Sequence, residues 1–135
     1  SANVGIAKAS NGIARVTNGT TGVGALGAAL PVASKTSGYS VLNTDTGYAF
    51  DNIGASGSVT FTLPTPAAGL NYRVCRVADQ AVVVDVAAGV TIQSGASATT
   101  SGGDVSLSAV GSCLHIWAVS TTQWFGLLAG TASFN

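Results

Sequence analysis

The most regular pattern in the chain is an alternation of apolar and hydroxyl side chains over Ser58–Leu63. Its odd-numbered positions are Val, Phe and Leu, and its even-numbered positions are Ser, Thr and Thr. A period of two places one row of side chains on a core and the other row toward water. Pro64 ends the pattern because proline cannot donate a hydrogen bond to a sheet ladder. The segment therefore predicts a β-strand that is buried on one face.

Eight further segments have short apolar runs, with turn-forming residues such as Gly, Asn and Asp between many of them. The expected strands are Tyr39–Asn43, Tyr48–Asn52, Tyr72–Val77, Ala81–Val86, Val90–Gln93, Val105–Ser108, Ser112–Val119 and Gln123–Ala129. No segment of residues 39–135 has helical periodicity, so the pattern there predicts an all-β sandwich or barrel. Val82–Val84 and Leu114–Trp117 are apolar on both faces. They predict a sheet covered by a second sheet on one side and by a neighbouring subunit on the other.

The first 38 residues differ from this body and contain a repeat of seven residues. The repeat starts at Gly5 and Gly12 and, in decayed form, at Gly19. One interpretation is a short parallel coiled coil of three chains, although a glycine in each heptad costs about 1 kcal/mol. The other is a set of extended pieces joined by tight turns at the two Asn-Gly pairs, and we favour it. An arm that orders only on a partner is compatible with both. The chain thus divides into an N-terminal arm and connector, residues 1–38, and a body, residues 39–135.

Charge is scarce in this chain, and its distribution bears on the kind of partner. Only 7% of the residues are charged, against about 25% in an ordinary soluble domain, and the net charge is zero. No long-range field attracts nucleic acid or anionic lipid. A neutral chain with 47% hydrophobic residues tends to associate, which favours a homo-oligomer or a subunit of a larger assembly. The alternative is a monomer kept soluble by its Ser, Thr and Gly residues.

The candidate reactive side chains do not form a recognisable catalytic or metal-binding motif. Cys75 and Cys113 are expected to be buried free thiols rather than a disulfide, and their spacing excludes a local metal knuckle. His115 lies two residues from Cys113 on one strand face, but no third group that would orient it is recognisable. We expect a histidine hydrogen-bonded in or near the core. Asp45 and Asp51 are expected to cap turns, so we predict no enzyme activity, cofactor or metal.

The body also resembles a known family over about residues 39–130. The resemblance is carried by an ordered set of residues: Asn52, Gly54-Ala55, Val59–Pro64, Gly69, Tyr72, Ala88–Ile92, Gly102-Gly103, Gly111-Ser112 and Trp124. This set resembles the β-barrel knob domains of tailed-phage virion proteins, which occur on tail fibres, tail needles and small head decoration or head-fibre proteins. The resemblance implies a jelly-roll-like barrel that assembles as a homotrimer and has no enzymatic activity of its own.

Within this family, the short N-terminal arm favours a head decoration subunit that binds the outside of a phage capsid. Its partners would be further copies of itself and the major capsid protein, and its location the virion surface, after synthesis in the host bacterial cytoplasm. One residue of the pair Trp124-Phe125 is expected to reach a subunit contact. The residues expected to contact the capsid are Ile6, Ile13 and Val16, which would be buried, and Lys8 and Arg15, which would face acidic groups.

Two other functions remain open from the sequence. The first is a receptor-binding tip of a tail fibre or needle, which would bind a host surface glycan through loops such as Ser94–Gly103. The second is a β-sandwich carbohydrate-binding or adhesin module outside phage biology.

Overall fold

The computed structural model describes residues 5–8, 14–17 and 30–135 of the chain. Near the N-terminus, β1 (Gly5–Lys8) and β2 (Ala14–Thr17) pair with each other in antiparallel register, with Ile6 opposite Val16. Extended backbone in both segments agrees with the interpretation as short strands and not with a helical coiled coil. Ile13 and the two Asn-Gly pairs lie outside the described residues.

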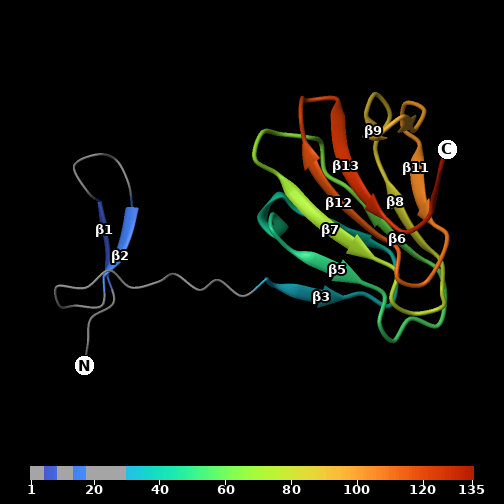
Figure 1. The fold of residues 1–135 in the computed structure, drawn as a ribbon, viewed down its shortest axis with the longest axis horizontal. Coiled ribbons are helices and arrows are strands. Elements are labelled where there is room, and N and C mark those ends of the chain that lie inside the picture. The colour runs from blue at the N-terminus through green and yellow to red at the C-terminus, as the bar shows by residue number, and fades with distance from the viewer. Residues whose placement is uncertain (1–4, 9–13, 18–29) are drawn as a thin grey trace.

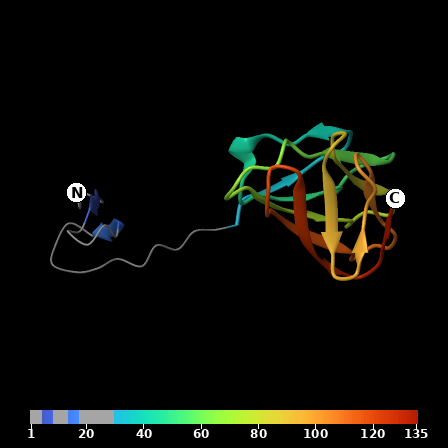
Figure 2. The ribbon, with the colours of Figure 1, turned by 90° about the horizontal axis from the view of Figure 1, so that it is seen from above.

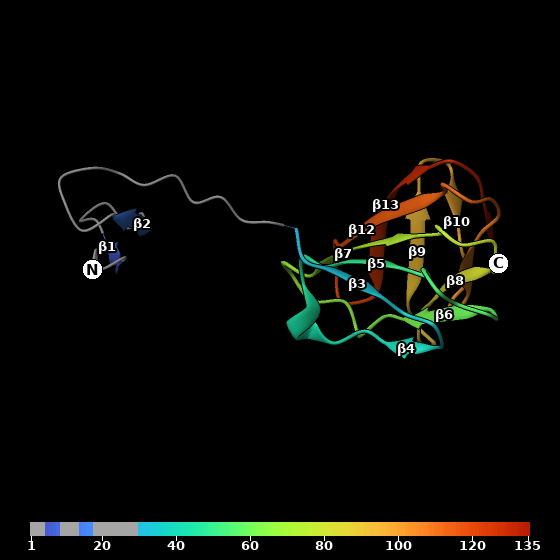
Figure 3. The same cartoon turned by 90° about the horizontal axis from the view of Figure 1, so that it is seen from below.

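The body is a sandwich of two packed β-sheets, which Figures 1 to 3 show from three sides. The seven-stranded sheet consists, in spatial order, of β10 (Ser97–Ala98), β9 (Thr91–Ser94), β13 (Gln123–Ala129), β12 (Cys113–Ala118), β7 (Asn71–Cys75), β5 (Ala49–Asp51) and β3 (Val32–Ser34). The five-stranded sheet consists of β14 (Ala132–Phe134), β11 (Asp104–Leu107), β8 (Val82–Asp85), β6 (Val59–Thr62) and β4 (Tyr39–Ser40). A 3-10 turn, η1 (Asn43–Asp45), connects β4 to β5.

From β3 to β9 the chain crosses from one sheet to the other at every step. As a result β3, β5 and β7 lie side by side and parallel in one sheet, and β4, β6 and β8 do the same in the other. The strands that follow add antiparallel neighbours, with β12 next to β7 and β11 next to β8. The prediction of an all-β sandwich is confirmed. Its mixture of parallel and antiparallel pairs differs from the antiparallel pairing of a regular jelly roll.

All nine predicted strands are present, with ends that differ by a few residues. Three short strands at sheet edges were not predicted, namely β3, β10 and β14. Strand β3 lies inside the expected connector and pairs with β5, so the folded body begins before Tyr39. The sequence around β3 is rich in Ala, Gly and Ser and has no alternation long enough to indicate a strand.

The core lies between the two sheets and is filled by the inward row of each strand. In β6, Val59 and Phe61 are completely buried and the following Leu63 is 4% exposed, as the alternation predicted. The largest completely buried side chains are aromatic or aliphatic: Trp124, Tyr72, Phe50, Phe61, Ile92, Leu107, Leu114 and Ile116. Aromatic rings meet across the core, with ring centroids 5.5 Å apart for Phe50 and Phe61. Edge and offset contacts of this kind add to the stabilisation from burial.

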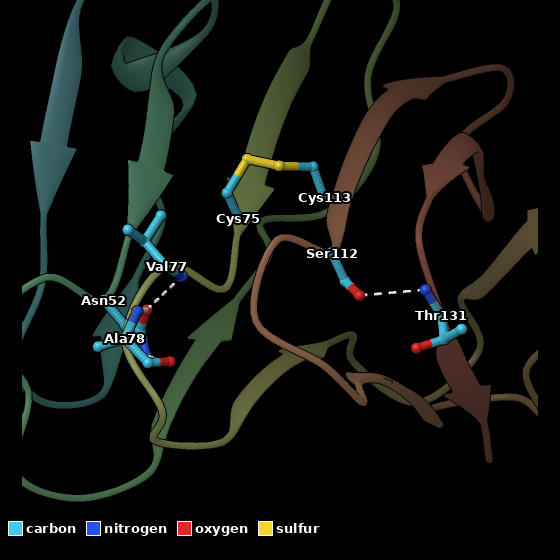
Figure 4. Close-up of a disulfide and its surroundings, with 7 residues drawn as sticks. All are labelled: Asn52, Cys75, Val77, Ala78, Ser112, Cys113 and Thr131. Atoms are coloured by element: carbon cyan, nitrogen blue, oxygen red, sulfur yellow. Dashed lines mark hydrogen bonds between the residues drawn. A yellow bond between two sulfur atoms is a disulfide. The ribbon is translucent and has the colours of Figure 1, made fainter.

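One buried polar side chain, Asn52, connects the end of β5 to the turn after β7. Its Oδ1 accepts hydrogen bonds from the backbone N–H groups of Val77 and Ala78, both at 2.8 Å (Figure 4). Its Nδ2 donates to the carbonyl oxygens of Ala78 and Gln80, at 3.3 and 3.0 Å. The side chain therefore replaces water for four backbone groups in a turn that has no sheet partner.

Replacing Asn52 with Ala should lower the free energy of unfolding by about 2–4 kcal/mol, because the turn would lose both acceptor and donor partners. Urea unfolding followed by intrinsic fluorescence measures this change. Asn43→Ala is the matched control, since Asn43 is exposed and its side chain makes no hydrogen bond within residues 30–135. Equal stabilities of the two variants would show that Asn52 does not hold the turn.

Candidate binding face

The outward side chains of β7, β12 and β13 form one continuous surface, which we call the apolar face. Strand register places them in rows: Trp117 lies opposite Asn71 and Phe125, and His115 lies opposite Arg73 and Leu127. The next row holds Cys113, opposite Cys75 and Ala129. Leu127 is 61% exposed although it is aliphatic. Arg73 is the one charged side chain in these three rows.

The outward side of the five-stranded sheet has the opposite character, and we call it the polar face. Its residues on β6, β8 and β11 are mainly hydroxyl and carboxylate side chains: Thr60, Thr62, Val83, Asp85, Asp104 and Ser106. Asp104 accepts hydrogen bonds on Oδ1 from Ser106 and from Asn135, each at 3.0 Å. This face is suited to water, whereas the apolar face is not.

Cys75 and Cys113 form a disulfide on the apolar face, so the expectation of free thiols is wrong. The two residues are direct partners in the β7–β12 register, with Cα atoms 4.1 Å apart (Figure 4). Such proximity is typical of a non-hydrogen-bonded antiparallel pair, where side chains lie closest. The bond excludes a Cys113–His115 nucleophilic pair, because the Cys113 sulfur has no thiol proton to give to a base. The sequence could not indicate the pairing, because it does not show that β7 and β12 are neighbours.

Removing the disulfide should lower the free energy of unfolding by about 3–4 kcal/mol, because the bond closes a segment of 38 residues in the unfolded chain. The measurement is urea unfolding of the wild type with and without dithiothreitol. The double variant Cys75→Ser, Cys113→Ser should be equally destabilised and should not respond to the reductant. Titration of thiols in the native, unreduced wild type should find none; two reactive thiols would contradict the pairing.

Two hollows open on the apolar face, on either side of His115. One, of about 390 Å³, is lined by Gly69, Leu70, Asn71, His115, Trp117 and Ala118. The other, of about 360 Å³, lies over the disulfide and is lined largely by Leu127, Leu128 and Ala129 together with Arg73 and His115. The hollows have different chemistry: the first combines an indole with an amide and an imidazole, and the second is mainly aliphatic.

His115 lies half-buried at the surface and not in the core. Within residues 30–135 its ring has no hydrogen-bond partner, so the expected core hydrogen bond is not found. The imidazole meets Trp117 edge-on, with ring centroids 5.7 Å apart. Burial, and secondarily the positive charge of Arg73, lower the pKa of His115 below its usual value. The ring is therefore neutral at pH 7 and offers one acceptor and one donor nitrogen.

The two residues predicted at a subunit contact occupy opposite sides of β13. Trp124 is completely buried against Tyr72, with ring centroids 5.7 Å apart, so it is not available for a contact between subunits. Phe125 lies on the apolar face and packs against Trp117 at 5.3 Å between centroids. Trp117 also lies on the apolar face, in agreement with the sequence pattern of Leu114–Trp117, which is apolar on both sides of the strand.

The other predicted site residues are dispersed. The backbone of Ile6, Lys8, Arg15 and Val16 lies in β1 and β2, and their side chains are not described. The predicted glycan loop, Ser94–Gly103, contains β10, which pairs back onto β9. This loop is fixed by buried Thr99, whose hydroxyl accepts a hydrogen bond from the N–H of Ile92 at 3.0 Å. Its sequence has no aromatic side chain on which a sugar could stack.

The prediction that Asp45 and Asp51 cap turns is confirmed. Asp45 accepts hydrogen bonds from the Leu42 N–H and the Tyr39 hydroxyl, each at 2.9 Å. Asp51 accepts one from the N–H of Ile53, also at 2.9 Å. These carboxylates are thus engaged with nearby groups of the turns. In the part of the chain that the structure describes, no three His, Cys, Asp or Glu side chains come together as metal ligands.

Comparison of the sequence with models of known protein families gives no match, and comparison with curated protein sequences gives none either. The resemblance to phage knob domains therefore stays a prediction. Among the described residues, no helix is both long and apolar enough to cross a bilayer.

Proposed function

We propose that this chain is a structural subunit of a phage particle, a head decoration protein that assembles with copies of itself on the outside of the capsid. The observation that supports this proposal is the contrast between the apolar and polar faces of the sandwich. A subunit with one wettable and one apolar sheet face suits a position in an assembly, with the polar face toward solvent. The phage context is inferred from the family resemblance. The apolar face is the surface through which copies of the chain would contact one another.

The apolar face has a property of a surface that is normally covered. It presents Leu127, Phe125 and the disulfide next to one another in adjacent rows. Contiguous apolar surface of this kind marks an interaction site in a soluble protein.

A second copy of the same chain is the partner that the charges favour. The net charge of the chain is zero, so two copies do not repel each other at long range. The apolar face contributes Arg73 as its charged side chain, which is exposed on β7, two strands away from Leu127. An acidic or basic partner would find little to pair with on this face. The contact would be centred on Leu127, in the hollow over the disulfide, with Phe125 beside it.

Leu127→Asp should convert a wild-type oligomer, a trimer by the family resemblance, into a monomer. The added carboxylate would be desolvated in the contact and would have no partner there. Light scattering coupled to size-exclusion chromatography measures the molar mass directly. Ser133→Asp is the matched control, because it adds the same charge at an exposed position on the outward side of β14.

The control should keep the wild-type mass and unfold within about 0.5 kcal/mol of the wild type, as is usual for exposed positions. Leu127→Asp should keep the far-UV circular dichroism spectrum of the wild type, because Leu127 is exposed in the single chain, but it should lose the part of the stability that association supplies. A wild type that is monomeric at high micromolar concentration would contradict self-association. An oligomer that tolerates Leu127→Asp would place the contact elsewhere.

The N-terminal strands are the proposed attachment to the capsid. Among the described residues, β1 and β2 pair with each other and belong to neither sheet of the sandwich. The proposed contacts remain Ile6, Ile13 and Val16 for burial and Lys8 and Arg15 for acidic groups. Each large aliphatic side chain buried on the shell would contribute roughly 1.5–3 kcal/mol, before the cost of ordering the arm. Three copies bound together would multiply this through avidity.

Deleting residues 1–18 should abolish binding to capsids and leave the oligomer of the body intact, because no strand of the sandwich is removed. Co-sedimentation with purified capsids that lack this chain measures binding, and light scattering measures the oligomer. Full-length Ser133→Asp should bind as the wild type does. A deletion variant that still saturates capsids would overturn the assignment of the arm.

A further inference from the structure

The hollow beside Trp117 contains an unusual set of groups for a subunit contact. Trp117, Asn71 and His115 line it together, so an indole, an amide and an imidazole meet around one space. Each group comes from the rigid β7–β12 pair, where Trp117 and Asn71 are direct partners. At about 390 Å³ the hollow lies toward the lower end of the range typical of small-ligand sites, roughly 300–1,000 Å³.

The side chains around the hollow are held in place before any ligand arrives. Phe125 packs against one part of the Trp117 indole, and His115 meets it edge-on. The Nδ2 of Asn71 donates to the Gly69 carbonyl at 3.3 Å and to the Thr46 hydroxyl at 3.4 Å. With the amide nitrogen engaged, the Oδ1 atom is left as an acceptor, for which residues 30–135 provide no partner. Such preorganisation lowers the entropic cost of binding.

The wall next to Asn71 depends on a single glycine. Residues Ala67–Leu70 form a tight turn in which the Leu70 N–H donates to the Ala67 carbonyl at 3.1 Å. Gly69, the third residue of this turn, has φ +90°, which a residue with a Cβ adopts only with strain. The turn thereby aims the Gly69 carbonyl at the Asn71 amide.

We propose that this hollow binds a short, uncharged saccharide. A sugar ring has an apolar C–H face, which would lie on the indole of Trp117, and hydroxyl groups, which would donate to Asn71 Oδ1 and exchange hydrogen bonds with the neutral ring of His115. A nucleotide would also stack on the indole, but it needs cationic groups for its phosphate, and the one cation of this face, Arg73, lines the other hollow. The site is independent of the proposed role in the capsid, and it lies on the sheet face and not in the predicted loop Ser94–Gly103.

The test is binding of the full-length protein to a printed array of neutral and acidic oligosaccharides, followed by titration calorimetry with the best neutral ligand. The wild type should bind at least one neutral saccharide, and Trp117→Ala should weaken it by at least about tenfold, equivalent to about 1.4 kcal/mol. Trp117→Phe, which keeps an aromatic ring, should restore most of the affinity. Ser133→Ala, at an exposed position on the polar face and outside this hollow, should bind as the wild type does.

Three outcomes of the binding experiments would overturn the saccharide site. They are no binding of any neutral saccharide by the wild type, binding that survives Trp117→Ala, and binding confined to acidic glycans that is lost in Arg73→Ala. Light scattering on Trp117→Ala separates this proposal from self-association. A variant that loses both saccharide binding and its oligomeric state would place Trp117 in the subunit contact and would also overturn the site.

Discussion

The structure depends on one constraint, which is that every strand of the sandwich must bury one row of side chains between two sheets. Because the chain crosses from sheet to sheet between β3 and β9, consecutive strands contribute to the core from opposite sides. The inward rows meet in a single aromatic and aliphatic core around Phe50, Phe61 and Tyr72. The outward rows have no such constraint, so their side chains can differ between the two sheets. They are mainly apolar on the apolar face and mainly hydroxyl and carboxylate on the polar face.

Strand patterns in the sequence predicted the all-β class, nine of the twelve strands of the sandwich and the buried residues of β6, because burial on one face leaves a period of two. The capping roles of Asp45 and Asp51 were also predictable, since an aspartate caps a turn through backbone groups only a few residues away. These features are local, and their physical causes lie within a few residues. The short edge strand β3 was missed because three residues do not contain enough alternation to indicate a strand.

The features that were not predictable depend on which strands become neighbours. The disulfide requires β7 and β12 to pair with Cys75 opposite Cys113, and two cysteines separated by 38 residues carry no information about that register. The same pairing brings Asn71 next to Trp117 and builds the hollow. Trp124 and Phe125 show the same limit. Adjacent residues in a strand point to opposite faces, but the sequence does not say which of the two faces the core.

The apolar face divides into two parts that place different demands on a partner. Around Leu127 and the disulfide the surface is aliphatic, and its burial is favourable with any well-fitted apolar surface. Around Trp117 the surface combines an indole with an acceptor amide, and an apolar partner there would leave Asn71 Oδ1 without a hydrogen bond at a cost of about 1–3 kcal/mol. A contact between copies is therefore favoured over the first part and disfavoured over the second. In the proposed assembly, this difference would let one sheet face hold copies together while its Trp117 end stays open to a polar ligand.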